Sequence, residues 1–403
     1  MSVQNKHVIR QCLHLLPLQD LVAWVLDYRK KLTTANLLKL FITGQLLHAK
    51  SLGSLEMYVR SEEQFQEEFG ISSISKSQLS RRINDVPTEI TQALFHAVME
   101  KMKAAGPQPE SFKWGKPLAL VDSTNIHLPF KFGDWAYVSK HDSRIKVHTR
   151  LLVLDKDTHI PDRIVPSTGN VSDFEGSDPL VVDLGVIYVM DRGYVSYLRM
   201  EKWVSNDLDF VMRISNHHHA KIVEEHALPE TPSFIQRDAA VLMGNQKTSM
   251  SSELRLIEFT DEQGRFYRLL TTCWKLDAVE IANIYRQRWL IELFFKWIKQ
   301  HLKVAKLYSC QPEAVWNHIF LAIVAYALPY LVKVGTRTKE SAWRVLELIR
   351  IYAMKPWHAF EKELLRKPSK PSRGRQKKDP PQPITVHASD VAIVKQPRKR
   401  RER

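Results

Sequence analysis

The amino-acid sequence predicts a mixed α/β fold, and three observations support that prediction. An apolar strand segment occurs at 116–128, an alternating β-rich segment at 144–154 and a return strand at 160–166. A continuous apolar segment follows at 185–190. Apolar residues at helical spacing mark other segments, above all 277–302. The resulting order of three strands, a helix, a strand, a helix and a strand is typical of a mixed sheet covered by helices.

Composition indicates a large protein with an anionic partner. The chain has 403 residues, which is enough for two or three domains. Its formal net charge is +15. The excess of Lys and Arg favours nucleic acid as partner, with a merely solubilising basic surface as the alternative. Three separated cysteines without C-x-x-C spacing suit a reducing cytoplasm. No apolar signal segment opens the sequence and the apolar run 318–332 is short, so we expect no membrane partner and a buried helix there.

Residues 1–105 carry apolar side chains at helical spacing and are expected to form a helical domain. Near its end, a short turn precedes a helix that Ser75 would cap. That helix would expose polar and basic side chains, namely Lys76, Gln78, Arg81 and Arg82. Such a face suits contact with DNA phosphates and base edges, which makes 1–105 a candidate DNA-binding domain. A solvated face of a plain helical bundle is the alternative.

Two apolar strands lead into aspartates. The strand at 116–128 is expected to end at Asp122, and the later strand at 185–190 ends at Asp191. Open α/β sheets bind ligands at the carboxyl ends of their strands, which makes both aspartates candidate site residues. A plain turn-forming role is the alternative for either one alone.

Basic side chains accompany these strands. The two strands that follow the first would form a meander with it, and their period of two places Lys146 and His148 on one face beside Asp122. Both could approach DNA or a substrate water. Arg192 and Arg213 could likewise contact phosphate.

The segment 277–302 predicts one long amphipathic helix that begins with a capping box between Asp277 and Glu280. Its charged stripe beside the apolar arc contains Tyr285, Arg288, Glu292, Lys296 and Lys299. If Glu292 converges with the two aspartates, three carboxylates repel one another unless cations neutralise them. Mg²⁺ or Mn²⁺ suits such an all-oxygen site. Two ions about 4 Å apart can activate water and stabilise the leaving oxygen of a phosphodiester, with the basic stripe holding phosphates.

These residues resemble a known family. The spacing Tyr285-x2-Arg288-x3-Glu292-x6-Lys299 resembles the signature of bacterial insertion-sequence DDE transposases, the YREK group of insertion-sequence family four. Asp122-Ser-Thr and Asp191-Arg-Gly-Tyr resemble the contexts of the family's first and second catalytic aspartates. The match runs in the family's order from Leu118 to Lys306.

The resemblance implies a ribonuclease-H-like core, divided into 112–215 and 276–362, that cleaves and joins DNA with Mg²⁺. It implies cut-and-paste movement by a homodimer on paired transposon ends. Carried over to this sequence, Asp122, Asp191 and Glu292 would bind the metal ions, and the remaining signature residues would contact end DNA: Tyr285, Arg288 and Lys299.

The resemblance also implies a β-rich insertion, for which 216–275 has the right position and contains a hairpin pattern near 253–270. Relatives use a tryptophan near this point to stack on a flipped base. Trp274 is the candidate by position, with simple packing as the alternative, and Trp289 is expected in the core. The Pro- and Lys/Arg-rich segment 366–403 is expected to be a disordered basic tail that grips DNA.

The sequence leaves two alternative functions open. One is a metal-dependent nuclease of the same fold that cuts DNA without joining it. The other is a non-catalytic DNA-binding repressor derived from a transposase, against which the complete set of three acids argues.

Overall fold

The computed structural model describes residues 6–366, apart from 24, 26, 29, 107–113, 130–132, 156–157, 229–233, 246–248 and 303–306. The chain up to Leu364 forms one compact unit. All but the first residue of the predicted basic tail lies outside the described residues.

A single mixed sheet organises the middle of the chain, which confirms the predicted α/β class. Its core strands are β1 (Leu118–Leu128), β3 (Asp142–Val153), β4 (His159–Thr168), β5 (Ile187–Met190) and β6 (Asp209–Ile214). They lie in the order β4-β3-β1-β5-β6, with β1, β5 and β6 parallel and the meander β1-β3-β4 antiparallel. The short strand β2 (Tyr137–Ser139) pairs with the outer part of β3. All four residues of β5 are buried, as its unbroken apolar sequence predicted.

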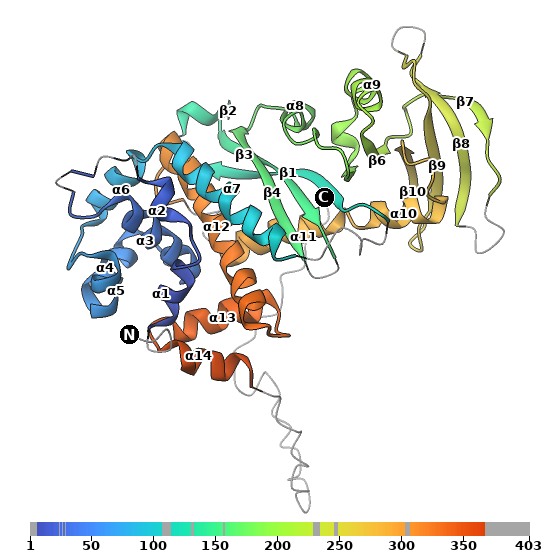
Figure 1. The fold of residues 1–403 in the computed structure, drawn as a ribbon. Coiled ribbons are helices and arrows are strands. Elements are labelled where there is room, and N and C mark those ends of the chain that lie inside the picture. The colour runs from blue at the N-terminus through green and yellow to red at the C-terminus, as the bar shows by residue number, and fades with distance from the viewer. Residues whose placement is uncertain are drawn as a thin grey trace, which may run out of the picture. The chain divides into compact units, whose positions relative to one another are not determined.

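The β-rich segment continues this same sheet. It contains β7 (Ala220–Glu225), β8 (Ile235–Met243), β9 (Leu254–Thr260) and β10 (Phe266–Thr271), and β9 with β10 forms the predicted hairpin. β10 pairs antiparallel with β6, so the added strands extend the core sheet at one end, drawn in yellow in Figure 1. This pairing satisfies the backbone groups that β6 would otherwise expose at a sheet edge.

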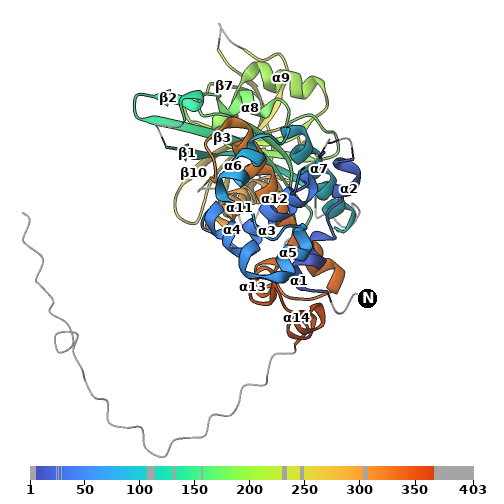
Figure 2. The same cartoon turned by 90° about the vertical axis from the view of Figure 1, so that its left-hand side faces the viewer.

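Helices from both ends of the chain share one core. The first seven are α1 (Val8–Leu13), α2 (Leu18–Leu21), α3 (Thr34–Leu46), α4 (Leu52–Ser61), α5 (Glu63–Phe69), α6 (Lys76–Asn84) and α7 (Thr88–Ala104). The last three are α12 (Pro312–Thr336), α13 (Ala342–Tyr352) and α14 (Trp357–Leu364). α12 packs against α3, α6 and α7, and Figure 2 shows the N-terminal helices gathered around it. The buried Asn317 side chain of α12 donates to the carbonyl oxygens of Ile83 and Val86.

α12 is long and apolar enough, by length and composition, to cross a membrane. Most of its residues are buried among the surrounding helices, and this confirms the buried helix predicted at 318–332. Its apolar sequence is therefore explained by its place in the core.

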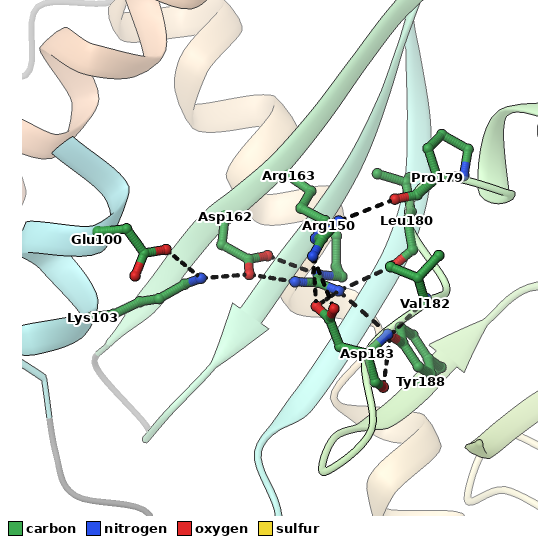
Figure 3. A network of polar contacts seen from close by, with 10 residues as sticks. All are labelled: Glu100, Lys103, Arg150, Asp162, Arg163, Pro179, Leu180, Val182, Asp183 and Tyr188. Atoms are coloured by element: carbon green, nitrogen blue, oxygen red, sulfur yellow. Dashed lines mark hydrogen bonds and ion pairs between the residues drawn. The ribbon is translucent and has the colours of Figure 1, made fainter. Parts of the chain in front are cut away.

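A buried polar network joins the helices to the sheet (Figure 3). Arg150 of β3 donates to both carboxylate oxygens of Asp162 on β4, at 2.9 and 2.6 Å. Its Nη1 lies 2.6 Å from Asp183 Oδ2, and Lys103 of α7 reaches Asp162 Oδ2 at 3.1 Å. The side chains of Arg150 and Asp162 are only 3% and 1% exposed. Buried charges of this kind require such complete pairing.

Candidate active site

Asp122 and Asp191 lie at neighbouring positions on parallel strands. β1 continues to Leu128, so Asp122 lies within a strand and the prediction that the strand ends there is wrong. β5, however, pairs with β1 only as far as Met190 beside Val121, so both aspartates come directly after the last paired residues. Asp191 follows the end of β5, as predicted.

Local hydrogen bonds orient both carboxylates. The Ser123 backbone N–H donates to Asp122 Oδ1 at 2.8 Å, and the Arg192 N–H donates to Asp191 Oδ1 at 2.5 Å. Each aspartate therefore keeps a second oxygen for another partner.

The segment 277–302 forms two helices, so the prediction of one continuous helix is wrong. α10 (Ala278–Arg286) and α11 (Trp289–His301) are separated at Gln287 and Arg288. The N–H groups of Gln287, Arg288, Leu290 and Ile291 each donate to the residue three positions earlier, a tighter turn than the α-helix. The capping box of Asp277 and Glu280 is confirmed.

This tight turn places Arg288 among the three acids. Its guanidinium donates to Glu292 Oε1 and lies 3.5 Å from Asp122 Oδ2. Burial alone would lower the pKa of Arg288. The nearby Tyr285, Glu292 and Asp191 outweigh that effect, so the pKa of Arg288 is raised. Arg288 therefore remains charged and links carboxylates from two elements of the chain.

The Asp122 carboxyl lies in a partly desolvated, acidic environment. Burial raises its pKa from 3.8 to about 6, and the nearby Asp191 and Asp173 add to that rise against the opposing effect of Arg288. Carboxylates with strongly shifted pKa values cluster at functional sites.

The donor set fits a hard divalent cation. Asp122, Asp191 and Glu292 offer only oxygen ligands, which Mg²⁺ and Mn²⁺ prefer. Among the described residues no three His, Cys, Asp or Glu side chains are close enough to hold a metal ion in the present arrangement. Asp122 and Glu292 instead pair with Arg288, and Asp191 interacts with the same charge, so the mutual repulsion of the acids is already offset by a cation.

The other basic residues of the signature helix lie further along α11. Lys296 is exposed and Lys299 is half-buried, and burial lowers the pKa of Lys299. Arg192 is exposed beside Asp191. These three cations are near enough to the surface to meet a polyanion.

A hollow of about 520 Å³ lies beside Arg288. Its lining includes Arg213, Tyr267, Tyr285, Arg288 and Trp289. Arg213 lies over the Tyr267 ring at 4.5 Å, and burial raises the pKa of Tyr285 to about 12. Trp289 is 58% exposed, so the prediction that it lies in the core is wrong. The tight turn at Arg288, which the sequence pattern did not reveal, makes Trp289 the first residue of a new helix.

Trp274 lies away from this site. It is 44% exposed and lines a separate hollow with Ile187 and Asp209, the first residues of β5 and β6. Asp191 follows the opposite end of β5, so the length of that strand separates Trp274 from the acids. The structure therefore does not bring Trp274 together with them.

Lys146 and His148 share one face of β3, and β3 pairs with β1 around Asp122, both as predicted. His148 is fully buried, its Nε2 is 2.9 Å from Ser167 Oγ, and burial lowers its pKa to about 4. It thus has no surface to offer DNA, and the predicted contact is wrong. Lys146 donates to the Val171 carbonyl and to Asp173 Oδ1, at 2.8 and 3.2 Å.

Asp173 is a site neighbour that the sequence did not reveal. It is the first residue of α8 (Asp173–Ser177), and its carboxylate accepts a hydrogen bond from Ser123 Oγ at 2.7 Å. An aspartate after a serine is also typical of a helix start. The sequence therefore could not distinguish a residue that only starts a helix from one that also contacts the site.

α6 carries the predicted basic face in part. Ser75 caps it in a full capping box with Gln78, and Lys76 and Arg81 are exposed. Arg82 instead donates to the Leu32 carbonyl at 3.0 Å and is half-buried, so its predicted exposed position is wrong. Hollows of about 600 and 430 Å³ flank α6, and Arg81 lines both.

Comparisons with known proteins give similarities to transposases. The family model described as "Transposase DDE domain" matches residues 113–328, more than half of the chain. The chain is 27% identical over 314 residues to a probable transposase for insertion sequence element IS5377 of Geobacillus stearothermophilus, covering 77% of this chain and 80% of that protein. It is 33% identical over 215 residues to a putative transposase of Sinorhizobium fredii, covering 52% and 59% of the two chains.

Two further similarities are more limited. A putative transposase for insertion sequence element IS4SA of Synechocystis is 28% identical over 172 residues, or 41% of this chain and 45% of that one. Among solved structures, a piggyBac transposase synaptic complex with hairpin DNA covers 91% of this chain and 84% of that chain. Its TM-score is 0.43 at 12% identity, which is too distant for any conclusion.

Proposed function

The chain belongs to the DDE transposase family, and from that membership we propose how its own residues cut and join DNA. It is a DNA transposase of the bacterial insertion-sequence type. The proposal is that Asp122, Asp191 and Glu292 form the catalytic set. The observation that supports it best is their gathering around one guanidinium, that of Arg288.

We propose that the core sheet is ribonuclease-H-like. The strand order β4-β3-β1-β5-β6, with an antiparallel meander followed by two parallel strands, supports this. So does the location of the acids on β1, after β5 and on a helix that packs on β1.

The three acids would hold two Mg²⁺ or Mn²⁺ ions. When bound, such ions activate a water and stabilise the oxygen that leaves phosphorus. Arg288 would turn from the carboxylates to a phosphate, where its planar donors can bind two oxygens. Neighbouring phosphates would be neutralised by Lys299, Lys296 and Arg192. The buried Tyr285 would hold Arg288 in position.

Each chemical step exchanges one phosphorus–oxygen bond for another. Water attacks the phosphodiester at the transposon end, which leaves a 3′-hydroxyl and a 5′-phosphate. The 3′-hydroxyl then attacks a phosphorus of the opposite strand or of target DNA and displaces a 3′-oxygen. The same acids serve both steps, because each has an oxygen nucleophile and an oxygen leaving group. The outcome is cut-and-paste movement.

Trp289 replaces Trp274 as the proposed stacking residue. Its exposed ring borders both Arg288 and the 520 Å³ hollow, so a base displaced near the cleaved bond could enter beside it. Stacking of a base on an aromatic ring is worth about 1–3 kcal/mol.

The helices before residue 105 are proposed to bind the element ends. Lys76 and Arg81 of α6, with Lys50 and Lys31 in the flanking hollows, have no ion-pair partner within the described part of the chain. Paired ends would call for a homodimer, and chromosomal DNA as substrate places the protein in the bacterial cytoplasm.

A strand-transfer assay tests this function. Intact element ends and, in parallel, pre-cleaved ends carrying a 3′-hydroxyl are mixed with supercoiled target DNA and Mg²⁺. A transposase joins the ends to the target, and cleavage of intact ends without any joining would instead indicate the nuclease. Binding with neither reaction would indicate the repressor.

A further inference from the structure

The Asp173 carboxylate lies between the two aspartate motifs. Its Oδ1 accepts the hydrogen bond from Ser123 Oγ at 2.7 Å, and Ser123 directly follows Asp122. Its Oδ2 faces Gly193, where an added methyl group would lie 3.5 Å away, and Gly193 belongs to the turn after Asp191. α8 also packs against that turn, η5 (Arg192–Tyr194). Asp173 therefore contacts the residue after Asp122 directly and lies beside the turn after Asp191.

Several contacts hold Asp173 in this place. Ser172 and Glu175 form a capping box that defines the start of α8. Lys146 Nζ donates both to Asp173 Oδ1 and to the Val171 carbonyl, which fixes the residues before the helix as well. The side chain is held by partners on β1 and β3.

Packing fixes α8 as a whole. A methyl group added at Gly176 would lie 2.2 Å from His148 Nδ1, so the helix backbone lies directly on the His148 ring. His148 is in turn held by Ser167 of the neighbouring strand β4. This close approach gives Lys146 and His148 a common role, because both anchor α8 to the sheet.

Electrostatics agree with this arrangement. The Asp173 charge is one of the groups that raise the pKa of Asp122, so the two carboxylates interact. The buried Tyr194 hydroxyl also responds to Asp122, Asp173 and Asp191, and its pKa is raised mainly by burial and then by these charges.

We propose that Asp173 is a positioning residue for the catalytic Asp122. It holds the Ser123 side chain, and the Ser123 backbone N–H orients Asp122 Oδ1. Its other oxygen lies beside the turn that follows Asp191. The inference rests on the proposed function, because it requires Asp122 to be a catalytic acid.

The test compares single-turnover cleavage of element-end DNA by full-length variants. Asp173→Ala removes the acceptor, Asp173→Asn keeps an oxygen acceptor without the charge, and Ser123→Ala removes the donor. Asp178→Asn is the matched control, because Asp178 lies at the end of the same helix and pairs with Arg199 on the surface. DNA affinity and thermal melting are measured for every variant.

Loss of a residue that orients a ligating side chain typically costs 10–100-fold in activity or metal affinity. Asp173→Ala should therefore cleave about 10–100-fold more slowly at unchanged DNA affinity, and Asp173→Asn should recover part of that loss. Adding Asp173→Ala to Ser123→Ala should cost clearly less than the product of the two single losses, because both variants remove the same Ser123–Asp173 hydrogen bond. Asp178→Asn should stay within about twofold of the wild type.

Three results would overturn the proposal. Asp173→Ala could cleave as fast as the control, or the losses of Ser123→Ala and Asp173→Ala could multiply. Unfolding of both Asp173 variants would assign the residue a structural role alone. Asp122→Asn tests the premise separately. Full cleavage by that variant would show that Asp122 is not a catalytic acid, whatever the Asp173 variants do.

Discussion

At the scale of single residues, Arg288 and Asp122 define the electrostatics of the proposed site. The raised pKa of Asp122 means that its ionised form is less favourable in the folded chain than in the unfolded one. The ionised Asp122 carboxylate therefore lowers the stability of the fold, and the proposed catalytic role gives a reason for keeping it.

This cost predicts a pH-dependent stabilisation by Asp122→Asn. The folded pKa of about 6 exceeds the ordinary value of 3.8, so ionisation of Asp122 lowers the free energy of unfolding as pH rises through that interval. In EDTA the variant should be more stable than the wild type at pH 7.5, on the order of 2 kcal/mol. The gain should disappear near pH 4. Chemical denaturation at both pH values measures it, and an equal gain at both would contradict the pKa assignment.

Trp289 and Trp274 make a matched pair of exposed tryptophans. Trp289→Ala should slow cleavage and weaken binding of DNA with an unpaired terminal base, by about 1–3 kcal/mol. Trp274→Ala should leave cleavage and DNA binding nearly unchanged, because Trp274 lies at the end of β5 away from the acids. Anisotropy titrations with paired and unpaired ends give the comparison, and the reverse order of effects would restore Trp274 as the stacking residue.

The sequence predicts some residues of the proposed site and not others. Asp122, Asp191, Glu292 and Arg288 could be predicted because their spacing and contexts form a specific signature. Asp173 could not, because its place depends on the packing of α8 on β3, which is not visible in local sequence.

At the scale of elements, strands and capped helices were predictable, but the tight turn at 287–288 was not. The apolar period continues across 277–302, so nothing in it marks the change from α-helical to shorter hydrogen bonds. That change orients Arg288 and exposes Trp289, so it shapes the site more than the helix itself does.

Helix α6 leads to a prediction about salt dependence. Exchanging Lys76 and Arg81 for Gln should weaken binding to element ends and to unrelated DNA, because binding to phosphates dominates affinity. Removal of each phosphate-binding cation should reduce the slope of log affinity against log salt by about 1. Lys339→Gln with Lys355→Gln removes two exposed charges elsewhere and is the control. An unchanged slope in the α6 variant would exclude this helix from DNA.

At the scale of the whole molecule, helices from both ends of the chain and the central sheet form one compact unit. The sequence divides into helical, strand-rich and helical stretches, which suggested separate domains. It could not show that α12 fills the centre of the N-terminal helices or that β10 joins β6, because both arrangements bring together segments far apart in the sequence.

The Arg150 network is the polar part of this connection, and its loss should destabilise the fold. Arg150→Met leaves Asp162 buried without its main partner, which should cost about 3–5 kcal/mol in unfolding free energy. Arg163→Gln removes a half-exposed partner of Asp183 and should cost less than about 1 kcal/mol. Urea denaturation measures both, and equal effects would show that burial of the network does not determine its contribution.

The central claim is that Asp122, Asp191 and Glu292 act as one catalytic set in a DNA transposase. Cleavage of element-end DNA by Glu292→Gln in Mg²⁺ tests it most directly, with Glu347→Gln on α13 as a surface control. The claim predicts cleavage below detection for Glu292→Gln, with DNA affinity and melting close to wild type and full cleavage by the control. Wild-type cleavage by Glu292→Gln would contradict it.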